Sequence, residues 1–334
     1  MIPAPNPLQR FLDHQRVVVL DGGFATELER RGAVLDSALW SAQLLLDDPG
    51  ALVEVHRSFL EAGADCIATA TYQASFEGFE AVGVCRGEAE RLMLGSVALA
   101  TRAVDDFWAI GENRADRLRP LVAASLGPYG AFLADGSEYD GRYGVGRDVL
   151  ERFHRDRFRV MASSAADLIA FETIPSFAEA EVILQLLDET PDVWAWLSFS
   201  CRDGEHLNDG TPIRDVVAVC AETDRIAAVG VNCTPPRFMA ELISEIRAET
   251  GLPVAVYPNS GEAYDASSKS WSRGSGGTGL VGTEFGGGKD GGTRDAWGEA
   301  AAEWVEAGAS LVGGCCRVTA SDISGVRSRV VSLG

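Results

Sequence analysis

The chain has 334 residues, of which 46% are hydrophobic, and this is enough for two average domains or for one large α/β barrel with a sizeable core. Its 29 basic and 49 acidic residues give a formal charge of -20, so it should repel a nucleic-acid backbone rather than bind it. The start carries three prolines, and no stretch approaches the roughly 20 apolar residues of a membrane span, so we expect neither a signal peptide nor a membrane segment.

Short β-branched runs recur along the chain, and each is followed by polar or glycine residues and then by a helical pattern. The first half has predicted strands at 17–20, 65–69, 121–126 and 168–171. Helices are expected at 49–62, at 87–107 and after residue 146. This alternation is typical of an α/β fold with a parallel sheet.

The second half repeats the same unit. Its predicted strands are 193–199, 226–231, 253–257 and 310–312, with helices at 175–188, 212–222, 235–249 and 294–307 and a last helix capped at 321–322. Eight strands spaced roughly 40 residues apart predict one (β/α)8 TIM barrel that forms a single domain over residues 1–334. A doubly wound open sheet is the alternative, but the first strand lacks its phosphate-binding glycine turn.

One segment interrupts the rhythm. Residues 267–293 are dominated by Gly, Ser and basic residues, with two aromatic residues embedded in them. A loop of this length in a compact domain is usually a functional lid or disordered. Both interpretations stay open for this insertion, which leaves from the seventh strand.

The barrel prediction brings distant residues together, because the C-terminal ends of barrel strands meet at one mouth where active sites lie. Residues at or near these ends carry much of the chain's reactive chemistry. In chain order they are Asp21, Thr69, Tyr129, Glu172, Ser198, Cys233, Asn259, Cys315 and Cys316.

Three of these residues are cysteines. The adjacent pair Cys315 and Cys316 can hardly form a mutual disulfide, because disulfide geometry requires a specific separation and torsion. With Cys233 the pair would offer three soft ligands to one zinc ion, whose open fourth position suits activation of a substrate thiol. We expect Gly313 and Gly314 to let the backbone bend so that both sulfurs reach the metal. The alternative is a non-catalytic zinc or thiol site, structural or redox-active.

The remaining cysteines carry no such signal. An odd total of seven in a long chain argues against a disulfide framework and favours a reducing, cytoplasmic location. The other four are expected to fill the core: Cys66, Cys85, Cys201 and Cys220.

Seven motifs follow one another along the chain: DGGFATEL (21–28), SLGPYG (125–130), ADGSEY (134–139), FETIP (171–175), GVNC (230–233), YPNSGE (257–262) and GGCC (313–316). Taken together and in this order, they resemble the homocysteine S-methyltransferase family over nearly the whole chain. The similarity is greatest to the branch that uses S-methylmethionine, and there is no folate- or cobalamin-binding extension. The long Gly-rich insert after residue 262 departs from the pattern.

The resemblance implies roles for individual residues. Cys233, Cys315 and Cys316 match the zinc ligands, and Asp21 and Glu172 match the carboxylates that hold the ammonium of homocysteine. Without the resemblance, Asp21 would be a turn former and Glu172 a helix cap at about even odds. The backbone amides of Gly22, Gly23 and Thr69 would take the substrate carboxylate, and the same motifs add Asn232 and Asn259 to the expected binding residues.

The resemblance also implies a reaction. The donor would be a sulfonium, S-methylmethionine or S-adenosylmethionine, and homocysteine thiolate on zinc would take its methyl group directly, giving methionine. Aromatic faces attract such cations, which makes Trp40, Tyr72 and Tyr129 candidates for the donor site. A selenocysteine or betaine-linked methyltransferase of the same family is an alternative. The partners would be these small molecules, and the chain would be a monomer or a homodimer.

Overall fold

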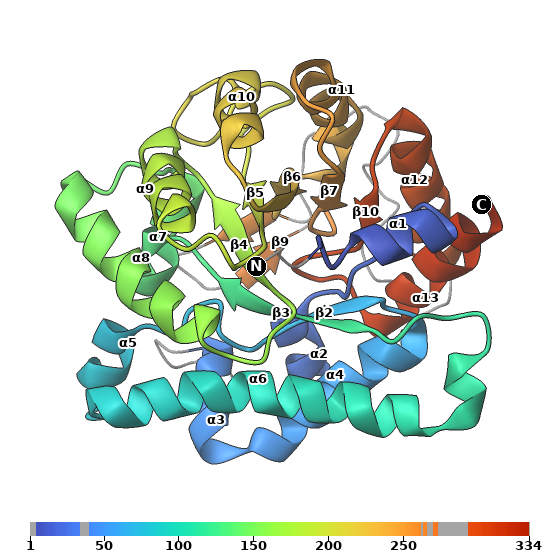
Figure 1. The fold of residues 1–334 in the computed structure, drawn as a ribbon, viewed down its shortest axis with the longest axis horizontal. Helices are drawn as coiled ribbons and strands as arrows, with labels where there is room; N and C mark the ends of the chain where they lie inside the picture. The colour runs from blue at the N-terminus through green and yellow to red at the C-terminus, as the bar shows by residue number, and fades with distance from the viewer. Residues whose placement is uncertain (1–4, 34–39, 262, 266–269, 273–292, 334) are drawn as a thin grey trace.

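The computed structural model describes residues 5–33, 40–261, 263–265, 270–272 and 293–333. An eight-stranded parallel sheet is rolled into a nearly closed barrel with helices around it, in the order β1-β10-β7-β6-β5-β4-β3-β2 (Figure 1). This confirms the predicted TIM barrel. The strands are β1 (Val18–Val19), β2 (Cys66–Ala68), β3 (Leu121–Leu126), β4 (Leu168–Ile174), β5 (Ala195–Phe199), β6 (Ile226–Asn232), β7 (Val254–Tyr257) and β10 (Leu311–Val312).

Helices follow the strands and form the outer layer. The α-helices are α1 (Gln9–Gln15), α2 (Phe24–Arg30), α3 (Leu44–Asp47), α4 (Pro49–Ala62), α5 (Phe76–Ala81), α6 (Arg86–Ala109), α7 (Tyr129–Leu133), α8 (Arg147–Ala162), α9 (Phe177–Asp188), α10 (Ile213–Glu222), α11 (Met239–Glu249), α12 (Thr293–Ala307) and α13 (Ala320–Val330). Short 3-10 turns are η1 (Trp40–Gln43), η2 (Gly111–Arg114), η3 (Ser137–Tyr139), η4 (Pro236–Phe238) and η5 (Val331–Leu333). Helix α4 begins and ends where the sequence predicts it.

Successive residues of a strand belong to two different hydrophobic cores. Leu121 and Ala123 of β3 belong to a cluster inside the barrel, whereas Val122 and Ala124 belong to the larger cluster between the strands and the helices. Leu8 and Phe11 of the N-terminal segment join the inner cluster, so α1 contributes to the packing of the barrel interior. The alternation follows from the opposite directions of successive strand side chains.

The barrel closes between β1 and β2 with few ladder contacts. One parallel bridge joins Leu20 to Cys66, and the amide of Asp65 donates to the carbonyl of Val19 at 2.7 Å. Two aspartate carboxylates add hydrogen bonds at this closure between β1 and β2, which we call the seam. Asp65 Oδ2 accepts from the Val19 amide at 3.0 Å, and Asp21 Oδ2 accepts from the Ala68 amide at 2.8 Å. Side chains thus supply part of the closure.

The insertion is described only in part. Strands β8 (Ala263–Asp265) and β9 (Ser270–Ser272) form an antiparallel pair that the sequence does not predict. The rest of the segment at 267–293, up to the start of α12, lies outside the described residues. Within the described part of the chain, no helix combines the length and the apolar character that crossing a membrane requires.

Candidate functional site

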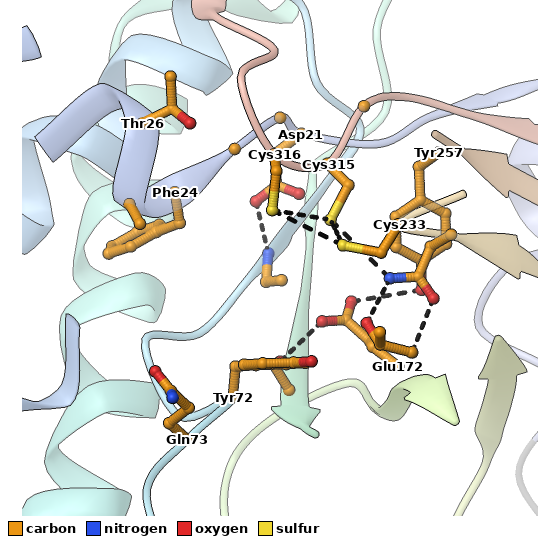
Figure 2. A pocket seen from close by; sticks show the side chains of 18 of the residues that line it. Asp21, Phe24, Thr26, Tyr72, Gln73, Glu172, Cys233, Tyr257, Cys315 and Cys316 are labelled. Carbon is orange, nitrogen blue, oxygen red and sulfur yellow. Dashed lines mark hydrogen bonds between the residues drawn. The ribbon is translucent and has the colours of Figure 1, made fainter. Parts of the chain in front are cut away.

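A pocket opens at the C-terminal ends of the barrel strands (Figure 2). Its lining comes from segments far apart in the chain, as the barrel prediction requires. It brings together these residues singled out from the sequence: Asp21, Gly22, Gly23, Thr69, Tyr72, Glu172, Asn232, Cys233, Cys315 and Cys316.

The three cysteine sulfurs converge in this pocket. The Sγ atom of Cys233 lies 2.8 Å from that of Cys315 and 3.6 Å from that of Cys316, and the latter two are 4.0 Å apart. Each cysteine is free. Among the described residues, these three cysteines are the one group of at least three Cys, His, Asp or Glu side chains that lie close enough together to hold one metal ion.

The thiols perturb one another strongly. Hydrogen bonds from Cys315 and Cys316 lower the pKa of Cys233 well below its usual value. The pKa of each of the other two thiols is raised, first by its hydrogen bond with Cys233 and further by burial. Three thiolates this close together would repel one another. Protons on the sulfurs reduce that repulsion, and a bound divalent cation would reduce it further.

The sulfur triangle fits zinc after a small adjustment. A tetrahedral site with Zn–S distances of about 2.3 Å separates its sulfurs by about 3.8 Å. The separations of 3.6 and 4.0 Å agree with this value, and the 2.8 Å pair would open by about 1 Å. Three protein ligands leave a fourth position free, which is the pattern of catalytic rather than structural zinc.

Neighbouring side chains orient the cysteines. The Asn232 amide nitrogen donates to the hydroxyl of Thr173 at 2.8 Å and lies 3.9 Å from Cys315 Sγ, while its oxygen accepts from the Thr173 amide at 2.7 Å. The hydroxyl of Tyr139 lies 4.0 Å from Cys233 Sγ. Contacts of this kind fix the direction of metal ligands.

The glycines before the cysteine pair allow close packing of the chain. Neither Gly313 nor Gly314 has a positive φ, so a bend there does not use the left-handed conformation that favours glycine. A Cβ on Gly313 would lie 2.7 Å from Leu20 Cβ, and one on Gly314 would lie 2.2 Å from Val318 Cγ1. Glycine is required because the chain passes so close to its neighbours.

Two carboxylates face the pocket beside the sulfurs. Burial raises the pKa of Asp21 well above its ordinary value, and the charge of Glu172 adds to this effect. Glu172 accepts from Ser125 Oγ at 2.8 Å and from the Tyr257 hydroxyl at 3.4 Å, and burial raises its pKa to about 7. A cation between the two carboxylates would relieve both costs.

The expected carboxylate-binding amides differ in availability. The amide of Gly23 donates to the Val318 carbonyl at 2.8 Å, and that of Thr69 donates to the Ala123 carbonyl at 3.0 Å. Both residues line the pocket, but their amides are engaged, which argues against this role. In the described part of the chain the Gly22 amide has no such partner, so it remains the candidate.

The aromatic residues expected at the donor site differ in whether they line the pocket. Tyr72 lines the pocket, whereas Tyr129 is not part of the described lining and packs edge-on against Phe153, with ring centroids 5.1 Å apart. Asn259 also lies outside that lining, and its side chain accepts from the Gly261 amide at 3.2 Å. The side chain of Trp40 lies outside the described residues.

Reading strand ends missed several pocket residues. Tyr257 ends β7 and lines the pocket, and so do Glu138 and Tyr139, which lie on η3 in the loop after β3. The motif at 134–139 was the available signal, but a strand-end rule does not reach it. Cys66, Cys201 and Cys220 are buried as expected, whereas Cys85 is exposed, so its core assignment was wrong.

Comparison with known proteins agrees with this geometry. The family model described as homocysteine S-methyltransferase matches residues 18–330. The chain is 44% identical to homocysteine S-methyltransferase YbgG of Bacillus subtilis, over 98% of this chain and 99% of that protein. It is also 44% identical to a selenocysteine Se-methyltransferase of Brassica oleracea, over 94% of this chain and 89% of that protein.

A solved structure shares the fold closely. The metallated form of the homocysteine methyltransferase MmuM from Escherichia coli superposes with a TM-score of 0.83 at 40% identity, covering 97% of this chain and all of that one. Its apo form gives a TM-score of 0.74.

Proposed function

The chain belongs to the homocysteine S-methyltransferase family and is a methyltransferase, and from this premise we propose that it makes methionine from homocysteine and S-methylmethionine. S-adenosylmethionine is the other sulfonium donor that the same site would suit. The observation that carries the proposal is the convergence of three cysteine sulfurs beside the carboxylates of Asp21 and Glu172 in one pocket.

We assign zinc to the sulfurs of Cys233, Cys315 and Cys316, whose number, spacing and thiolate character suit that ion. When bound there, zinc would supply a Lewis acid that lowers the pKa of the homocysteine thiol and keeps it ionised near neutral pH. Thiolate ligands favour a nucleophilic sulfur over water activation, which usually uses His and carboxylate ligands.

The chain's own residues would orient homocysteine. Asp21 and Glu172 offer negative charge to its ammonium group, and the free amide of Gly22 is placed to bind its carboxylate. Asn232 would keep Thr173 and Cys315 in position at the edge of the same pocket. Fixing both ends of the amino-acid group would direct the thiol toward the cysteines.

The proposed transfer is a direct in-line displacement. The homocysteine sulfur forms a bond to the donor's methyl carbon, and the bond from that carbon to the sulfonium sulfur breaks. Its electron pair goes to the leaving sulfur, which departs as a neutral thioether. No protein nucleophile is needed, so the contribution of the protein lies in proximity, orientation and exclusion of water.

Selenocysteine is a second candidate acceptor. A relative named selenocysteine Se-methyltransferase is as similar to this chain as the homocysteine enzyme of Bacillus subtilis, with 44% identity in each case. A selenolate has the same charge and similar softness, and its amino-acid group could meet the same carboxylates. Overall identity therefore does not separate the two acceptors.

Turnover assays test the proposal. Zinc-loaded protein is incubated with homocysteine or selenocysteine and with S-methylmethionine, S-adenosylmethionine or betaine, and the methylated product is measured. We expect methionine from homocysteine with a sulfonium donor. Absence of product with every pair would overturn the proposal, and zinc-edge spectra unchanged by homocysteine would favour a non-catalytic metal site.

A further inference from the structure

The pocket has a marked imbalance of charge. Asp21, Glu29, Glu138 and Glu172 all line it, whereas the described lining contains no Lys, Arg or His side chain. The proposed role of Asp21 and Glu172 accounts for one cation, the ammonium of homocysteine. Of the two remaining carboxylates, Glu29 is exposed and Glu138 is buried, and neither has a role in holding that substrate.

One oxygen of the buried Glu138 carboxyl group has no hydrogen-bond partner within the described structure. The residue is 9% exposed, and this oxygen is Oε2. Burial is the main reason that the pKa of this carboxyl rises to about 7, and the negative charge of Cys233 adds to it. A buried carboxylate oxygen without a partner is costly, so this arrangement calls for a cation from outside the chain.

The backbone holds Glu138 firmly in this place. The Ser200 hydroxyl donates to its carbonyl at 3.4 Å, and the preceding Ser137 amide donates to Asp135 Oδ1 at 3.0 Å. A Cβ on Gly130 would lie 2.4 Å from the Glu138 nitrogen, so α7 packs directly against the turn. The backbone that carries Glu138 is therefore held in place beside the pocket.

The surroundings of Glu138 indicate which cation it meets. Glu138 is followed directly by Tyr139, whose hydroxyl lies 4.0 Å from Cys233 Sγ, so its turn lies at the sulfur end of the pocket. Tyr72 and Tyr139 line the same region, and aromatic rings attract onium groups. A methyl donor must bring its sulfonium to this end, because the methyl carbon has to reach the acceptor sulfur.

We propose that Glu138, together with the rings of Tyr72 and Tyr139, binds the sulfonium of the methyl donor, an inference that rests on the proposed function and names a residue for its second substrate. The sulfonium loses its charge as the methyl group leaves. Glu138 therefore stabilises the bound donor more than the transition state, and its contribution belongs to donor affinity rather than to the rate of transfer.

The test is the Glu138→Gln variant, which keeps the size of the side chain and removes its charge. We expect the KM for S-methylmethionine to rise about 30-fold, as expected when one member of a buried charge pair is removed. The KM for homocysteine and the zinc content should stay within about twofold of wild type, and kcat should stay equal or rise. The thermal midpoint should not fall, because the variant removes a buried charge without a partner.

Two further measurements make the result decisive. Asp135→Asn neutralises an exposed carboxylate in the same loop and should leave both KM values unchanged, because an amide oxygen can still accept from the Ser137 amide. Trimethylsulfonium carries the sulfonium without an ammonium, and it should inhibit wild type better than Glu138→Gln. Equal inhibition of both proteins would show that Glu138 faces another group of the donor.

The outcomes separate the two proposals. An active wild type with an unchanged donor KM in Glu138→Gln would overturn the role of Glu138 and leave the proposed reaction standing. A joint loss of zinc, homocysteine affinity and thermal stability would assign Glu138 a structural role. A wild type that methylates neither acceptor would instead overturn the proposed function.

Discussion

Two residues of the pocket have an unfavourable backbone conformation. Thr173 and Cys233 have φ values of 61° and 48°, although neither is a glycine, and both line the pocket. Such left-handed conformations cost on the order of 1–3 kcal/mol each and persist where the surrounding structure imposes them. The contacts of Asn232 with Thr173 are part of that constraint.

The cysteine pair gives the first prediction. If the proposed zinc ion binds at the three cysteines, Cys315→Ser should remove most of it and abolish methyl transfer, because a hydroxyl is a poor replacement for a thiolate. Zinc is measured by atomic emission after dialysis. Cys85→Ser is the matched control, since Cys85 is exposed and is not part of the described pocket lining. Full zinc retention in Cys315→Ser would show that the metal ligands are misassigned.

Glu172 gives a pH prediction. Its pKa of about 7 lies above the ordinary value near 4.5, so the folded state favours the protonated form. The stability that this provides is present below pH about 4.5 and is lost as the pH rises through about 7. An ammonium ligand selects the ionised form, so binding has the opposite trend and strengthens as the pH rises.

Methionine is the suitable probe for this trend, because it carries the ammonium but no thiol proton. Its Kd should fall about tenfold between pH 6 and pH 8, following the ionised fraction of a group with this pKa. Asp21, whose pKa is also raised, acts in the same direction. Titration calorimetry measures the methionine Kd at each pH. In Glu172→Gln this Kd should depend much less on pH. A wild-type Kd that does not change with pH would contradict the assignment of Glu172 to the ammonium group.

The sequence allowed the cysteines to be predicted but not the whole pocket. Cys233 and the pair stand directly after apolar strands, and parallel strands in a barrel share one mouth, so their convergence follows from topology. Tyr129 stands in an equivalent position, yet its ring packs with Phe153 because α7 begins there. Glu138 reaches the pocket from a turn whose path depends on packing against Gly130, which no periodicity encodes.

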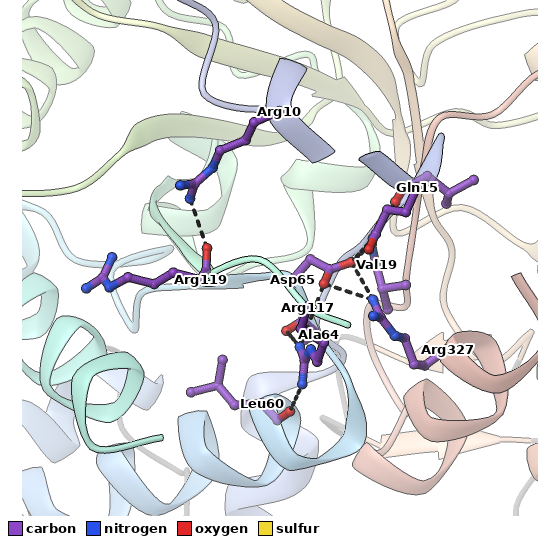
Figure 3. Close-up of polar contacts among 10 residues, drawn as sticks. Arg10, Gln15, Val19, Leu60, Ala64, Asp65, Arg117, Arg119 and Arg327 are labelled. Carbon is purple, nitrogen blue, oxygen red and sulfur yellow. Dashed lines mark hydrogen bonds and ion pairs between the residues drawn. The ribbon is translucent and has the colours of Figure 1, made fainter. Parts of the chain in front are cut away.

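At the level of elements, the seam of the barrel depends on Asp65 (Figure 3). This buried carboxylate accepts from Arg327 at 2.8 and 2.9 Å, from Gln15 at 2.6 Å and from the Val19 amide at 3.0 Å. Arg117 lies 3.7 Å away and also donates to backbone carbonyls of Leu60 and Ala64. One side chain thus connects α1, β1 and α13 beside β2.

Asp65→Asn should therefore destabilise the fold strongly. The variant leaves two largely buried guanidinium groups without a carboxylate, which typically costs about 3–5 kcal/mol in the free energy of unfolding. Asp105→Asn is the control, because Asp105 is exposed and its pairing with Arg119 should contribute less than about 1 kcal/mol. Urea denaturation measures both, and equal effects would show that the seam does not depend on this cluster.

The order of elements was predictable because eight amphipathic repeats admit few arrangements, but the seam was not. Strand β1 is short, and its bridge to β2 involves a single residue pair. The closure relies on contacts between Asp65 and Arg327, which are 262 positions apart. Sequence periodicity reports on local faces and carries no information about such a pairing.

For the molecule as a whole, a formal charge of -20 and a pocket rich in carboxylates produce a negative field around the mouth. S-methylmethionine carries a net charge of +1 near neutral pH, whereas homocysteine is a zwitterion without net charge. The field should therefore concentrate the donor near the pocket and leave the acceptor unaffected.

Ionic strength provides the test, because salt shortens the range of this field from about 30 Å at 0.01 M to about 8 Å at 0.15 M. Raising NaCl from about 10 to about 150 mM should increase the donor KM severalfold and change the homocysteine KM by less than about twofold. Steady-state kinetics with each substrate varied in turn supplies both values from one preparation. A parallel rise in both would indicate a salt effect on the enzyme itself, and an unchanged donor KM would show that contacts inside the pocket, rather than the surrounding field, determine donor capture.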